Sequence, residues 1–389
     1  MALTVGIIGL PQAGKTSLFN ALTSAGAQVS GYPTSTVQAN RAVVAVPDAR
    51  LDRLAEIYHP KKVTPTSVEF VDVAGIGQAT EVAHRQGLSA EFLGHIRNAD
   101  ALAIVLRCFT NEQVPTPAGG IDPVRDLDEL MAELALTDLA TVDKRIDATT
   151  RKAKTGDKKL LVELDVLRRV RDHLNEGRST SELALESADA AVLDELFLLT
   201  MKPRLYVANV SEDVLASAAE LIDAMQAGGP RAETRAGEQG RVARLTDRAH
   251  GEGAEIVAVS ARLEAELRDL SPDDAGEYLE ALGLPRLGTD RVIQAGYRLL
   301  SLISFLTAGE DEVRAWTVTS GSKAPTAAGK IHTDFERGFI RAEVVRYDDL
   351  MAVGGSMKIA REHGQVRLEG KDYVVRDGDI IEFRFNVSR

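Results

Sequence analysis

Short, nearly continuous runs of apolar and β-branched residues mark the first 125 residues and return after residue 200. Strands that are buried on both faces of a parallel sheet have this pattern, because neither side of the strand meets water. Polar or helical stretches separate the runs, which favours a doubly wound α/β domain. The expected strands are residues 5–8, 42–46, 68–73, 101–106, 205–208 and 256–259.

A different rhythm, with apolar residues mostly three or four positions apart, fills residues 127–178. It is interrupted around Thr155-Gly156-Asp157 and then resumes. This spacing predicts two amphipathic helices that form an antiparallel coiled-coil hairpin, inserted between the fourth and fifth strands. We expect a third helix near residues 190–199.

The last 85 residues contain short β-like runs at 314–319, 339–346 and 373–385, separated by Gly turns. They predict a small α+β domain, and the apolar run 299–306 predicts a core helix that bridges two domains. We therefore expect an α/β domain made of residues 1–125 and 200–304, a helical insert of residues 126–199, and a C-terminal domain of residues 305–389.

Composition narrows the choice of function. The chain has 46 Lys and Arg against 58 Asp and Glu, a net charge of −12, which argues against a protein that coats nucleic acid. A single cysteine, Cys108, excludes a disulfide framework and a multi-cysteine metal site. The longest uncharged apolar stretch is about half as long as a membrane-spanning helix, and we see no secretion signal. We expect a soluble cytoplasmic protein with no membrane contact.

The hairpin reverses the charge of the rest of the chain. Residues 143–178 hold eleven Lys and Arg against seven Asp and Glu, a net charge of +4. One interpretation is that the tip, around Lys152 to Lys159, binds RNA phosphates. The other is a solvated pair of helices with mixed charges.

A phosphate-binding loop follows the first strand. Gly9-Leu-Pro-Gln-Ala-Gly14-Lys15-Thr16 fits the pattern G-x-x-x-x-G-K-[ST] between a strand and a helix. In this motif the backbone N–H groups surround phosphate oxygens, the lysine reaches the β- and γ-phosphates, and the threonine hydroxyl coordinates Mg²⁺. The alternative is a Gly-containing turn with a surface lysine. The candidate phosphate-binding residues are Gly9, Gln12, Ala13, Gly14, Lys15, Thr16 and Ser17.

Two further segments complete the expected catalytic site. Asp72 ends the third strand and is positioned to hold Mg²⁺ through water, and the N–H of Gly75 is positioned to contact a γ-phosphate. Thr36 is the candidate switch hydroxyl that closes on Mg²⁺, with Thr34 or Ser35 as alternatives. The candidate catalytic residues are therefore Lys15, Thr36, Asp72 and Gly75, and the candidate metal ligands are Thr16 and Thr36.

The fifth strand ends in Asn209-Val210-Ser211-Glu212, where guanine-binding proteins of this architecture carry N-K-x-D. The carboxylate is one methylene longer, and Val210 replaces the lysine that stacks on the base. This favours ATP over GTP; the alternative is a plain strand-to-helix cap. Ser260, after the sixth strand, begins a Ser-Ala-Arg sequence that resembles a base-supporting loop.

Hydrolysis is expected to be slow. Ile76 follows Gly75, and its side chain cannot orient a water molecule as glutamine does in switch nucleotidases. His84 lies nearby, and we interpret it as a solvated loop residue.

Together these motifs resemble the YchF / Obg-like ATPase family of translation-factor-class P-loop proteins. The resemblance covers essentially the whole chain. It implies a P-loop NTPase sheet, the coiled-coil insert, a C-terminal TGS (β-grasp) domain, ATP preferred over GTP, slow hydrolysis and ribosome association. The residues that carry it are GLPQAGKTSLFNALT from Gly9, YPTSTVQAN from Tyr32, VPDARLD from Val46, DVAGI from Asp72, RCF from Arg107, KPRLYVANVSE from Lys202, AVSARLEAEL from Ala258 and GDIIEFRFNV from Gly378.

Two positions depart from the family pattern. Gln12 replaces the usual asparagine, which in related potassium-activated members helps to hold K⁺, so a role for K⁺ is doubtful. The loop of residues 110–120 lacks the histidine that is thought to assist hydrolysis in bacterial relatives.

The leading hypothesis is a Mg²⁺-dependent ATPase that acts as a conformational switch on the ribosome, on its large subunit or the whole particle. Ribosomal RNA phosphates would be contacted by the hairpin of residues 143–178. The alternatives are a GTPase of the Obg class, a non-hydrolysing nucleotide-gated binding module, and a P-loop kinase acting on a small metabolite.

Overall fold

The computed structural model describes residues 3–23, 28–29, 40–73, 90–117, 119–153, 157–229 and 236–386. The chain divides into two compact units. The first unit is residues 1–43 with 69–292, and the second is residues 44–68 with 293–389.

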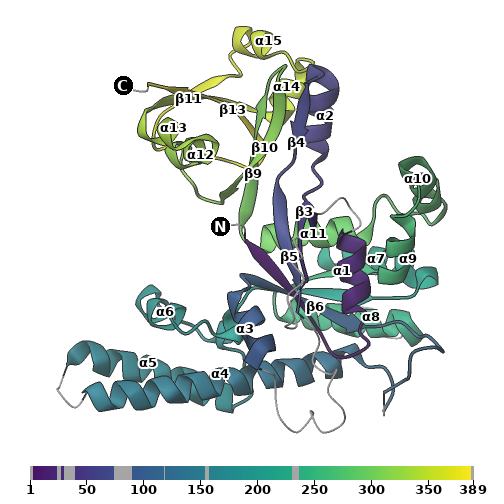
Figure 1. Ribbon diagram of the computed structural model, residues 1–389, viewed down its shortest axis with the longest axis vertical. Helices are drawn as coiled ribbons and strands as arrows, with labels where there is room; N and C mark the ends of the chain where they lie inside the picture. The colour runs from purple at the N-terminus through teal and green to yellow at the C-terminus, as the bar shows by residue number, and fades with distance from the viewer. Residues whose placement is uncertain are drawn as a thin grey trace. The chain divides into compact units, whose positions relative to one another are not determined.

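The first unit is built on a seven-stranded sheet in the order β2-β3-β5-β1-β6-β7-β8 (Figure 1). From β5 to β8 every neighbouring pair is parallel, so the carboxyl ends of these strands share one edge. All six strands expected from the apolar runs are present, and the doubly wound α/β fold is confirmed. The strands are β1 (Thr4–Ile8), β2 (Gln28–Val29), β3 (Asn40–Ala45), β5 (Ser67–Asp72), β6 (Ala101–Arg107), β7 (Arg204–Asn209) and β8 (Glu255–Val259).

Helices connect these strands, and their apolar faces bury the sheet. Ile104 of β6 and Tyr206 of β7 are fully buried with Leu130, Ile222 and Leu245 from three of the helices. The connecting helices are α1 (Lys15–Thr23), α3 (Ala90–Asn98), α7 (Glu212–Gln226), α8 (Gly237–Gly251), α9 (Ala261–Leu267) and α10 (Pro272–Ala281). Helix α11 (Gly288–Leu299) continues from the first unit into the second.

The helical insert consists of α4 (Pro123–Ala153) and α5 (Lys158–Asn175), which lie side by side in Figure 1. Val142 and Ile146 of α4 pack with Leu167 and Val170 of α5, as their spacing predicts. Residues 154–156, where the turn was expected, lie outside the described residues. The third helix is α6 (Ser187–Asp194), and single 3-10 turns follow α5 at Thr180–Glu182 and α6 at Leu199–Met201.

A buried carboxylate fixes the chain as it returns from the hairpin to the sheet. Asp138 of α4 accepts hydrogen bonds from the N–H groups of Leu199 and Thr200, both at 2.8 Å, and from the Thr200 hydroxyl at 2.7 Å. These three donors compensate for the burial of the carboxylate.

The second unit is a six-stranded mixed sheet in the order β12-β11-β13-β9-β10-β4. One face packs Phe305 and Val344 against Ala327, and the other packs Leu306 and Val345 against Leu54. The strands are β4 (Lys62–Thr64), β9 (Leu302–Ala308), β10 (Glu312–Thr319), β11 (Phe339–Arg346), β12 (Arg367–Glu369) and β13 (Asp379–Phe385). The helices are α2 (Ala49–Tyr58), α12 (Ala324–Ile331), α13 (Thr333–Arg337), α14 (Tyr347–Ala352) and α15 (Met357–Glu362).

The structure differs from the expected domain division at residues 44–68. This segment groups with the C-terminal residues, because β4 pairs in parallel with β10 and the α2 side chains of Leu51 and Leu54 enter the same core as Val313. A short amphipathic helix has the same pattern whichever sheet it covers, so the sequence does not reveal its partner. The C-terminal α+β architecture itself is as expected.

The prediction of a helix at residues 299–306 is wrong. Helix α11 ends at Leu299, Ser301 adopts a left-handed conformation with φ 54°, and β9 begins at Leu302. Ile303 and Phe305 favour a strand here, where each residue is registered against β10. Among the described residues, no helix has the length and apolar character needed to cross a membrane.

Candidate nucleotide-binding site

The loop between β1 and α1 has a backbone that requires its two glycines. Gly9 has φ 154° and Gly14 has φ 96°. A Cβ on Gly9 would overlap the carbonyl oxygen of Val105, and one on Gly14 would overlap the side-chain amide of Asn209. Gln12 also lies in the left-handed region, with φ 63°, where a side chain other than Gly, Asn or Asp is uncommon. The loop thus closes tightly against two neighbouring strands.

Lys15, the first residue of α1, points back across this loop. Its ammonium donates hydrogen bonds to the carbonyl oxygens of Gly9 at 2.9 Å and Leu10 at 2.8 Å. Burial lowers the pKa of Lys15 from 10.5 to about 8, and the nearby Asp72 carboxylate opposes this shift. Thr16 and Ser17 are exposed in the first turn of α1. The charge and the hydroxyls expected at the phosphates are therefore on one short segment.

Asn209, at the end of β7, connects three loops. Its side-chain amide donates to the carbonyl oxygen of Ala13 at 2.9 Å, and its side-chain oxygen accepts from the N–H of Ala261 at 3.1 Å. Its own carbonyl oxygen accepts from the N–H groups of Cys108 and Phe109, at 2.9 and 3.0 Å. The phosphate loop and the loops after β6 and β8 are therefore held to a single buried residue.

The other base-loop candidates point elsewhere. Val210 is 2% exposed and belongs to the core of the sheet, so it does not lie where a stacking lysine would. The Glu212 carboxylate accepts a hydrogen bond from the Tyr278 hydroxyl at 2.5 Å. Ser260 is buried beside Ala261 at the start of α9. Of the four base-loop candidates, Asn209 is hydrogen-bonded to the loop that contains Ser260. The side chain of Val210 packs in the core and that of Glu212 binds Tyr278, so neither takes part in this loop contact.

Asp72 is the last residue of β5 and is 7% exposed. Burial raises the pKa of its carboxyl, and the Lys15 ammonium opposes this shift. The carboxylate itself forms no hydrogen bond with any residue in the described part of the chain. A buried carboxylate without a donor, close enough to the Lys15 ammonium to interact with it, fits a site that holds Mg²⁺ partly through water. Thr36 and Gly75, with Ile76 and His84, lie outside the described residues.

Two residues in the first turn and a half of α8 were not expected from the sequence. Glu238 accepts hydrogen bonds from the N–H of Thr110 at 2.6 Å and from the Ser211 hydroxyl at 2.7 Å and N–H at 3.0 Å. Arg241 donates to the carbonyl oxygen of Cys108 at 2.8 Å and to the Thr110 hydroxyl at 2.9 Å. Helix α8 thereby fixes the loops after β6 and β7 to each other.

The side chain of Arg107 is hydrogen-bonded to the loop that follows β6. Its guanidinium donates to the carbonyl oxygens of Pro115 at 2.8 Å and Val114 at 3.2 Å, and it lies 4.8 Å from the centre of the Phe109 ring. The sequence R-C-F was visible, but nothing in it indicated that the arginine binds its own loop.

Comparison with known proteins identifies the family. A model described as a 50S ribosome-binding GTPase matches residues 4–144, and the YchF-GTPase_C model, described as a protein of unknown function, matches residues 302–386. Proteins named ribosome-binding ATPase YchF from Bacillus subtilis, Haemophilus ducreyi and Haemophilus influenzae are 44%, 43% and 42% identical, each covering 100% of both chains. The chain belongs to the YchF family.

A solved YchF structure supports the family fold along the whole chain. The Schizosaccharomyces pombe protein, described as a YchF GTPase, has a TM-score of 0.80 and 30% identity and covers 98% of this chain and 97% of its own. The family's printed names thus include both ATPase and GTPase.

Proposed function

We propose that this YchF protein is a ribosome-associated ATPase that switches conformation slowly between ATP- and ADP-bound forms. The observation that carries the proposal is the network at Asn209, which holds the phosphate loop to the loops after β6 and β8. The bacterial relatives named ribosome-binding ATPase, which match over their full length, support the partner. Such a protein would act in the cytoplasm, where ribosomes are.

The chain's own residues would bind and orient the triphosphate. Lys15 would turn from the carbonyls of Gly9 and Leu10 to the β- and γ-phosphates, while the loop N–H groups donate hydrogen bonds to the phosphate oxygens. Thr16, Thr36 and Asp72 would hold Mg²⁺, which supplies positive charge to the phosphates when bound. Water attacks the γ-phosphorus and releases ADP and phosphate. Ile76 offers no hydrogen bond to that water, so turnover is expected to be slow.

The base loop supports ATP as the preferred nucleotide. A guanine site needs a carboxylate that accepts from the N1–H and the exocyclic amine of the base. Here Glu212 is bonded to Tyr278, and Val210 is buried in place of the stacking lysine. Neither feature of a guanine site is assembled.

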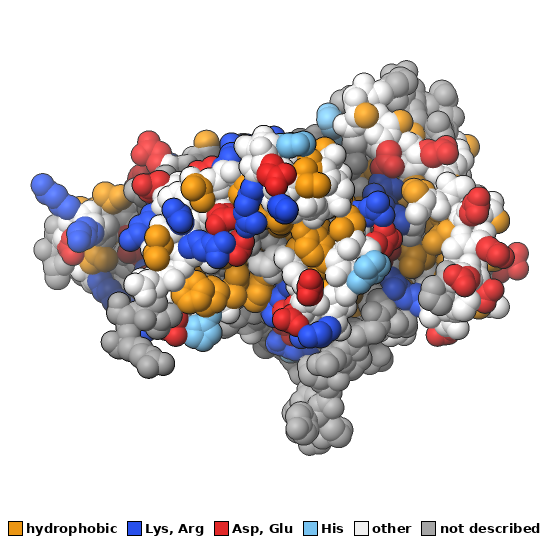
Figure 2. Space-filling view, turned by 90° about the horizontal axis from the view of Figure 1, so that it is seen from above, with side chains coloured by type: hydrophobic (Ala, Val, Ile, Leu, Met, Phe, Trp, Pro, Cys, Tyr) orange, Lys and Arg blue, Asp and Glu red, His pale blue; other side chains and the backbone are white. Residues whose placement is uncertain are grey.

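The helical hairpin is the proposed contact with ribosomal RNA. Five of its basic side chains are exposed and form no ion pair within the described part of the chain: Lys144, Arg151, Lys158, Lys159 and Arg168. By contrast, Arg145 pairs with Glu163 at 2.6 Å and Arg169 with Asp189 at 2.5 Å. Figure 2 shows Lys and Arg side chains at the left of the view, interspersed with acidic and apolar ones. Unpaired cations of this kind can neutralise phosphates.

Sedimentation through a sucrose cushion with purified ribosomes and with separated subunits tests the proposal. The protein should co-sediment, and ATP should change the bound fraction in the wild type but not in Lys15→Ala. An identical bound fraction with and without ATP would overturn the switch. Single-turnover hydrolysis with ribosomes then separates an ATPase from a non-hydrolysing module.

A further inference from the structure

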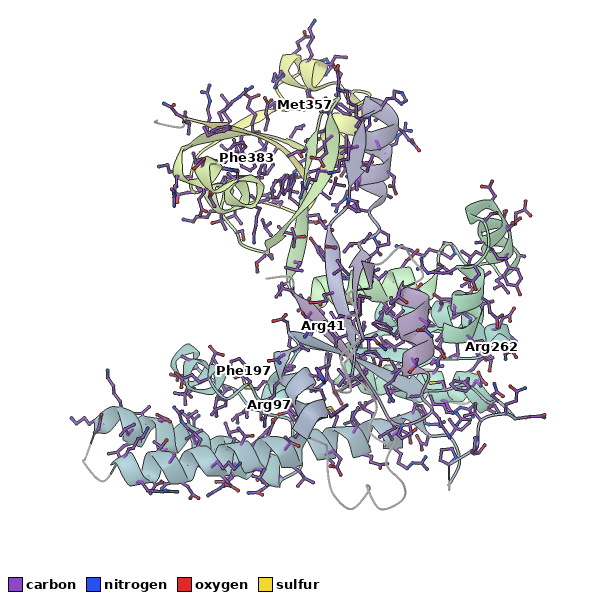
Figure 3. The ribbon with its side chains drawn as sticks, in the orientation of Figure 1. Arg41, Arg97, Phe197, Arg262, Met357 and Phe383 are labelled. Atoms are coloured by element: carbon purple, nitrogen blue, oxygen red, sulfur yellow. The ribbon has the colours of Figure 1, made fainter. Side chains whose placement is uncertain are left out.

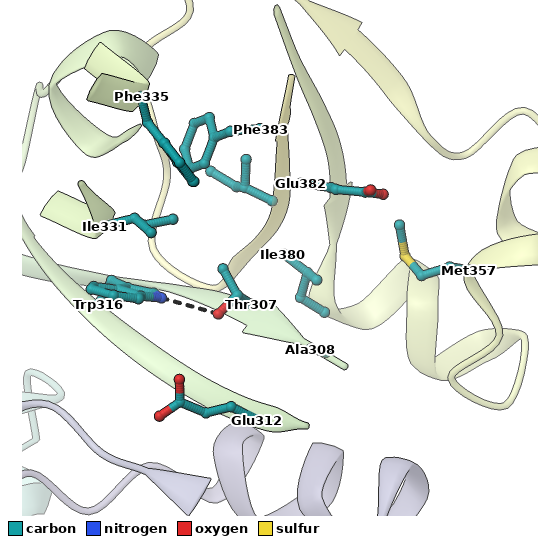
Figure 4. Close-up of a pocket in the computed structure, with 11 residues that line it drawn as sticks. Thr307, Ala308, Glu312, Trp316, Ile331, Phe335, Met357, Ile380, Glu382 and Phe383 are labelled. Atoms are coloured by element: carbon teal, nitrogen blue, oxygen red, sulfur yellow. Dashed lines mark hydrogen bonds between the residues drawn. The ribbon is translucent and has the colours of Figure 1, made fainter. Parts of the chain in front are cut away.

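A cavity of about 360 Å³ lies between β9 and β13 in the second unit (Figure 4). The two carboxylates that line it are already paired with cations of the same chain, Glu382 with Arg361 at 2.9 Å and Glu312 with Lys62 at 3.5 Å. The charges of its lining therefore indicate no ligand. In the first unit, by contrast, a buried carboxylate is bonded to backbone donors beside the nucleotide-binding site.

This carboxylate belongs to Glu264 in α9, the helix that begins directly after the base-loop candidate Ser260. Glu264 is 1% exposed, and burial raises the pKa of its carboxyl to about 7, although two backbone donors oppose the rise. Its oxygens accept hydrogen bonds from the N–H of Gly288 at 3.0 Å and the N–H of Thr289 at 2.6 Å. Both donors belong to the first turn of α11, where N–H groups have no partner within the helix. The carboxylate thus joins α9 to the start of α11.

Gly288 shows how closely the start of α11 approaches the base loop. The residue is buried, and a Cβ atom on it would lie 2.6 Å from the carbonyl oxygen of Ala258 and 2.7 Å from a carboxylate oxygen of Glu264. The same atom would lie 3.2 Å from the side chain of Val259. Ala258 and Val259 end β8, immediately before Ser260. The start of α11 therefore lies against the chain on both sides of Ser260.

Helix α9 is also held from the side of the phosphate loop. The N–H of Ala261, its first residue, donates to the side-chain oxygen of Asn209 at 3.1 Å, and the helix packs against α1. At its other end, Arg268 donates to the Thr289 hydroxyl at 3.0 Å and pairs with Asp290 at 3.2 Å. The short helix that follows Ser260 is therefore fixed between the phosphate-loop side of the site and the start of α11.

We propose that Glu264 and Gly288 are positioning residues for the base-binding loop at Ser260, and that they determine how tightly and how selectively the base of the nucleotide is held. The inference rests on the proposed function, because it takes this loop as the one that supports the base. Among the described residues, neither is hydrogen-bonded to the phosphate loop. Their contribution should therefore concern the base and not the phosphates.

Glu264→Gln tests this division. The amide keeps one acceptor oxygen but turns an NH₂ toward the second backbone N–H, so α11 holds α9 less firmly. ATP should bind about tenfold more weakly and its preference over GTP should narrow, whereas inorganic tripolyphosphate, which has no base, should bind as in the wild type. Displacement of a fluorescent ATP analogue by each compound, with Mg²⁺, measures all three affinities. Glu266→Gln is the matched control, since Glu266 lies exposed on the same helix and pairs with Arg262 (Figure 3).

Gly288→Ala approaches the same contact from α11. Its Cβ atom would force the start of α11 away from the base loop, so ATP should again weaken while tripolyphosphate does not. The losses in the double variant with Glu264→Gln should not add, because both act through one contact. Gly276→Ala is the matched control, since Gly276 is an exposed residue of α10 with open space around a Cβ atom.

The proposal is overturned if both variants leave ATP affinity and selectivity unchanged, or if both weaken tripolyphosphate as much as ATP, which would show a general loss of structure. The proposed function fails in a different way. If the wild type binds ATP, GTP and tripolyphosphate equally, no base is recognised, and this inference fails with it. If the wild type prefers GTP, only the preference for ATP is wrong, and a loss of GTP without a loss of tripolyphosphate supports the positioning role.

Discussion

The side-chain amide of Asn209 donates a hydrogen bond to the carbonyl oxygen of Ala13, across 196 positions of sequence and 2.9 Å of space. The bond joins the end of β7 to the phosphate loop. The Asn209 amide lies so close to Gly14 that a Cβ atom at this position would overlap it. The phosphate loop and the candidate base-binding loop after β8 are therefore both hydrogen-bonded to one buried residue.

Asn209→Ala should weaken ATP binding by about tenfold or more, because it leaves the buried Ala13 carbonyl and Ala261 N–H without partners, at about 1–3 kcal/mol. Calorimetric titration with ATP measures the change. Asn111→Ala is the matched control, since Asn111 caps only its own loop through the N–H of Gln113. Equal losses in the two variants would contradict the connecting role of Asn209.

Lys15 should make ATP binding dependent on pH. Its folded-state pKa of about 8 lies below the usual 10.5, so the ammonium is only partly charged at pH 8 and fully charged near pH 6. Phosphate binding favours the charged form, so binding at pH 8 should take up about half a proton. Affinity should then fall as the pH rises above 8.

Titration in buffers of different ionisation enthalpy measures this uptake. The uptake should vanish near pH 6 and should be missing in Lys15→Arg, whose side chain stays charged. Because burial penalises the charged amine, the lowered pKa also makes the free energy of unfolding of the nucleotide-free protein increase as the pH rises from 8 to 10.5. Uptake of the same size at pH 6 and pH 8 would show that Lys15 is not the group that titrates.

Glu238 should support nucleotide binding without touching the phosphates. Glu238→Gln replaces the acceptors of Thr110 and Ser211 with a weaker, neutral group, which frees the loops after β6 and β7. We expect ATP affinity to fall by roughly 1–2 kcal/mol and the preference for ATP over GTP to narrow. Glu220→Gln, at an exposed position of α7, should have no effect. If Glu238→Gln leaves the affinity for ATP and the preference for ATP over GTP unchanged, Glu238 does not support nucleotide binding.

The hairpin should contribute to ribosome binding through its unpaired cations. Replacing Arg151, Lys158 and Lys159 with Gln should weaken binding and reduce the salt slope of log K by roughly 2–3, since each phosphate contact releases about one counterion. ATP affinity should stay the same. Sedimentation over a series of salt concentrations gives both quantities.

The control for this variant uses basic residues of the same hairpin that already pair with carboxylates. Arg169 pairs with Asp189, and Arg171 with Asp172. Replacing Arg169 and Arg171 with Gln should change the salt slope less than the first set does. If the two variants change the salt slope of ribosome binding equally, the hairpin is a solvated pair of helices and the protein binds RNA through another surface.

The sequence predicts those parts of the structure whose pattern is local. Strands buried on both faces are continuous apolar runs, so β6 and β7 could be located directly. The phosphate loop could be located because Gly9, Gly14 and Lys15 have fixed spacing. What the sequence does not show is which distant segment a short element packs against, as with α2 and β4, which join the second unit.

Side-chain direction is the other limit. The comparison with N-K-x-D predicts that Val210 and Glu212 lie at the base. In the structure, the Val210 side chain packs in the core of the sheet and the Glu212 carboxylate accepts a hydrogen bond from Tyr278. Glu238 carried no signal, because a glutamate in the first turn of a helix is ordinary. Its contacts depend on where α8 lies beside β6 and β7, which is a property of the tertiary fold.

The central claim is that this family member binds ATP in preference to GTP at the loop held by Asn209. Calorimetric titration of the nucleotide-free wild-type protein with each nucleotide, in the same Mg²⁺ buffer, tests it most directly. We predict that ATP binds about tenfold to a hundredfold more tightly, a difference of roughly 1–3 kcal/mol. Equal affinities, or tighter binding of GTP, would contradict the account.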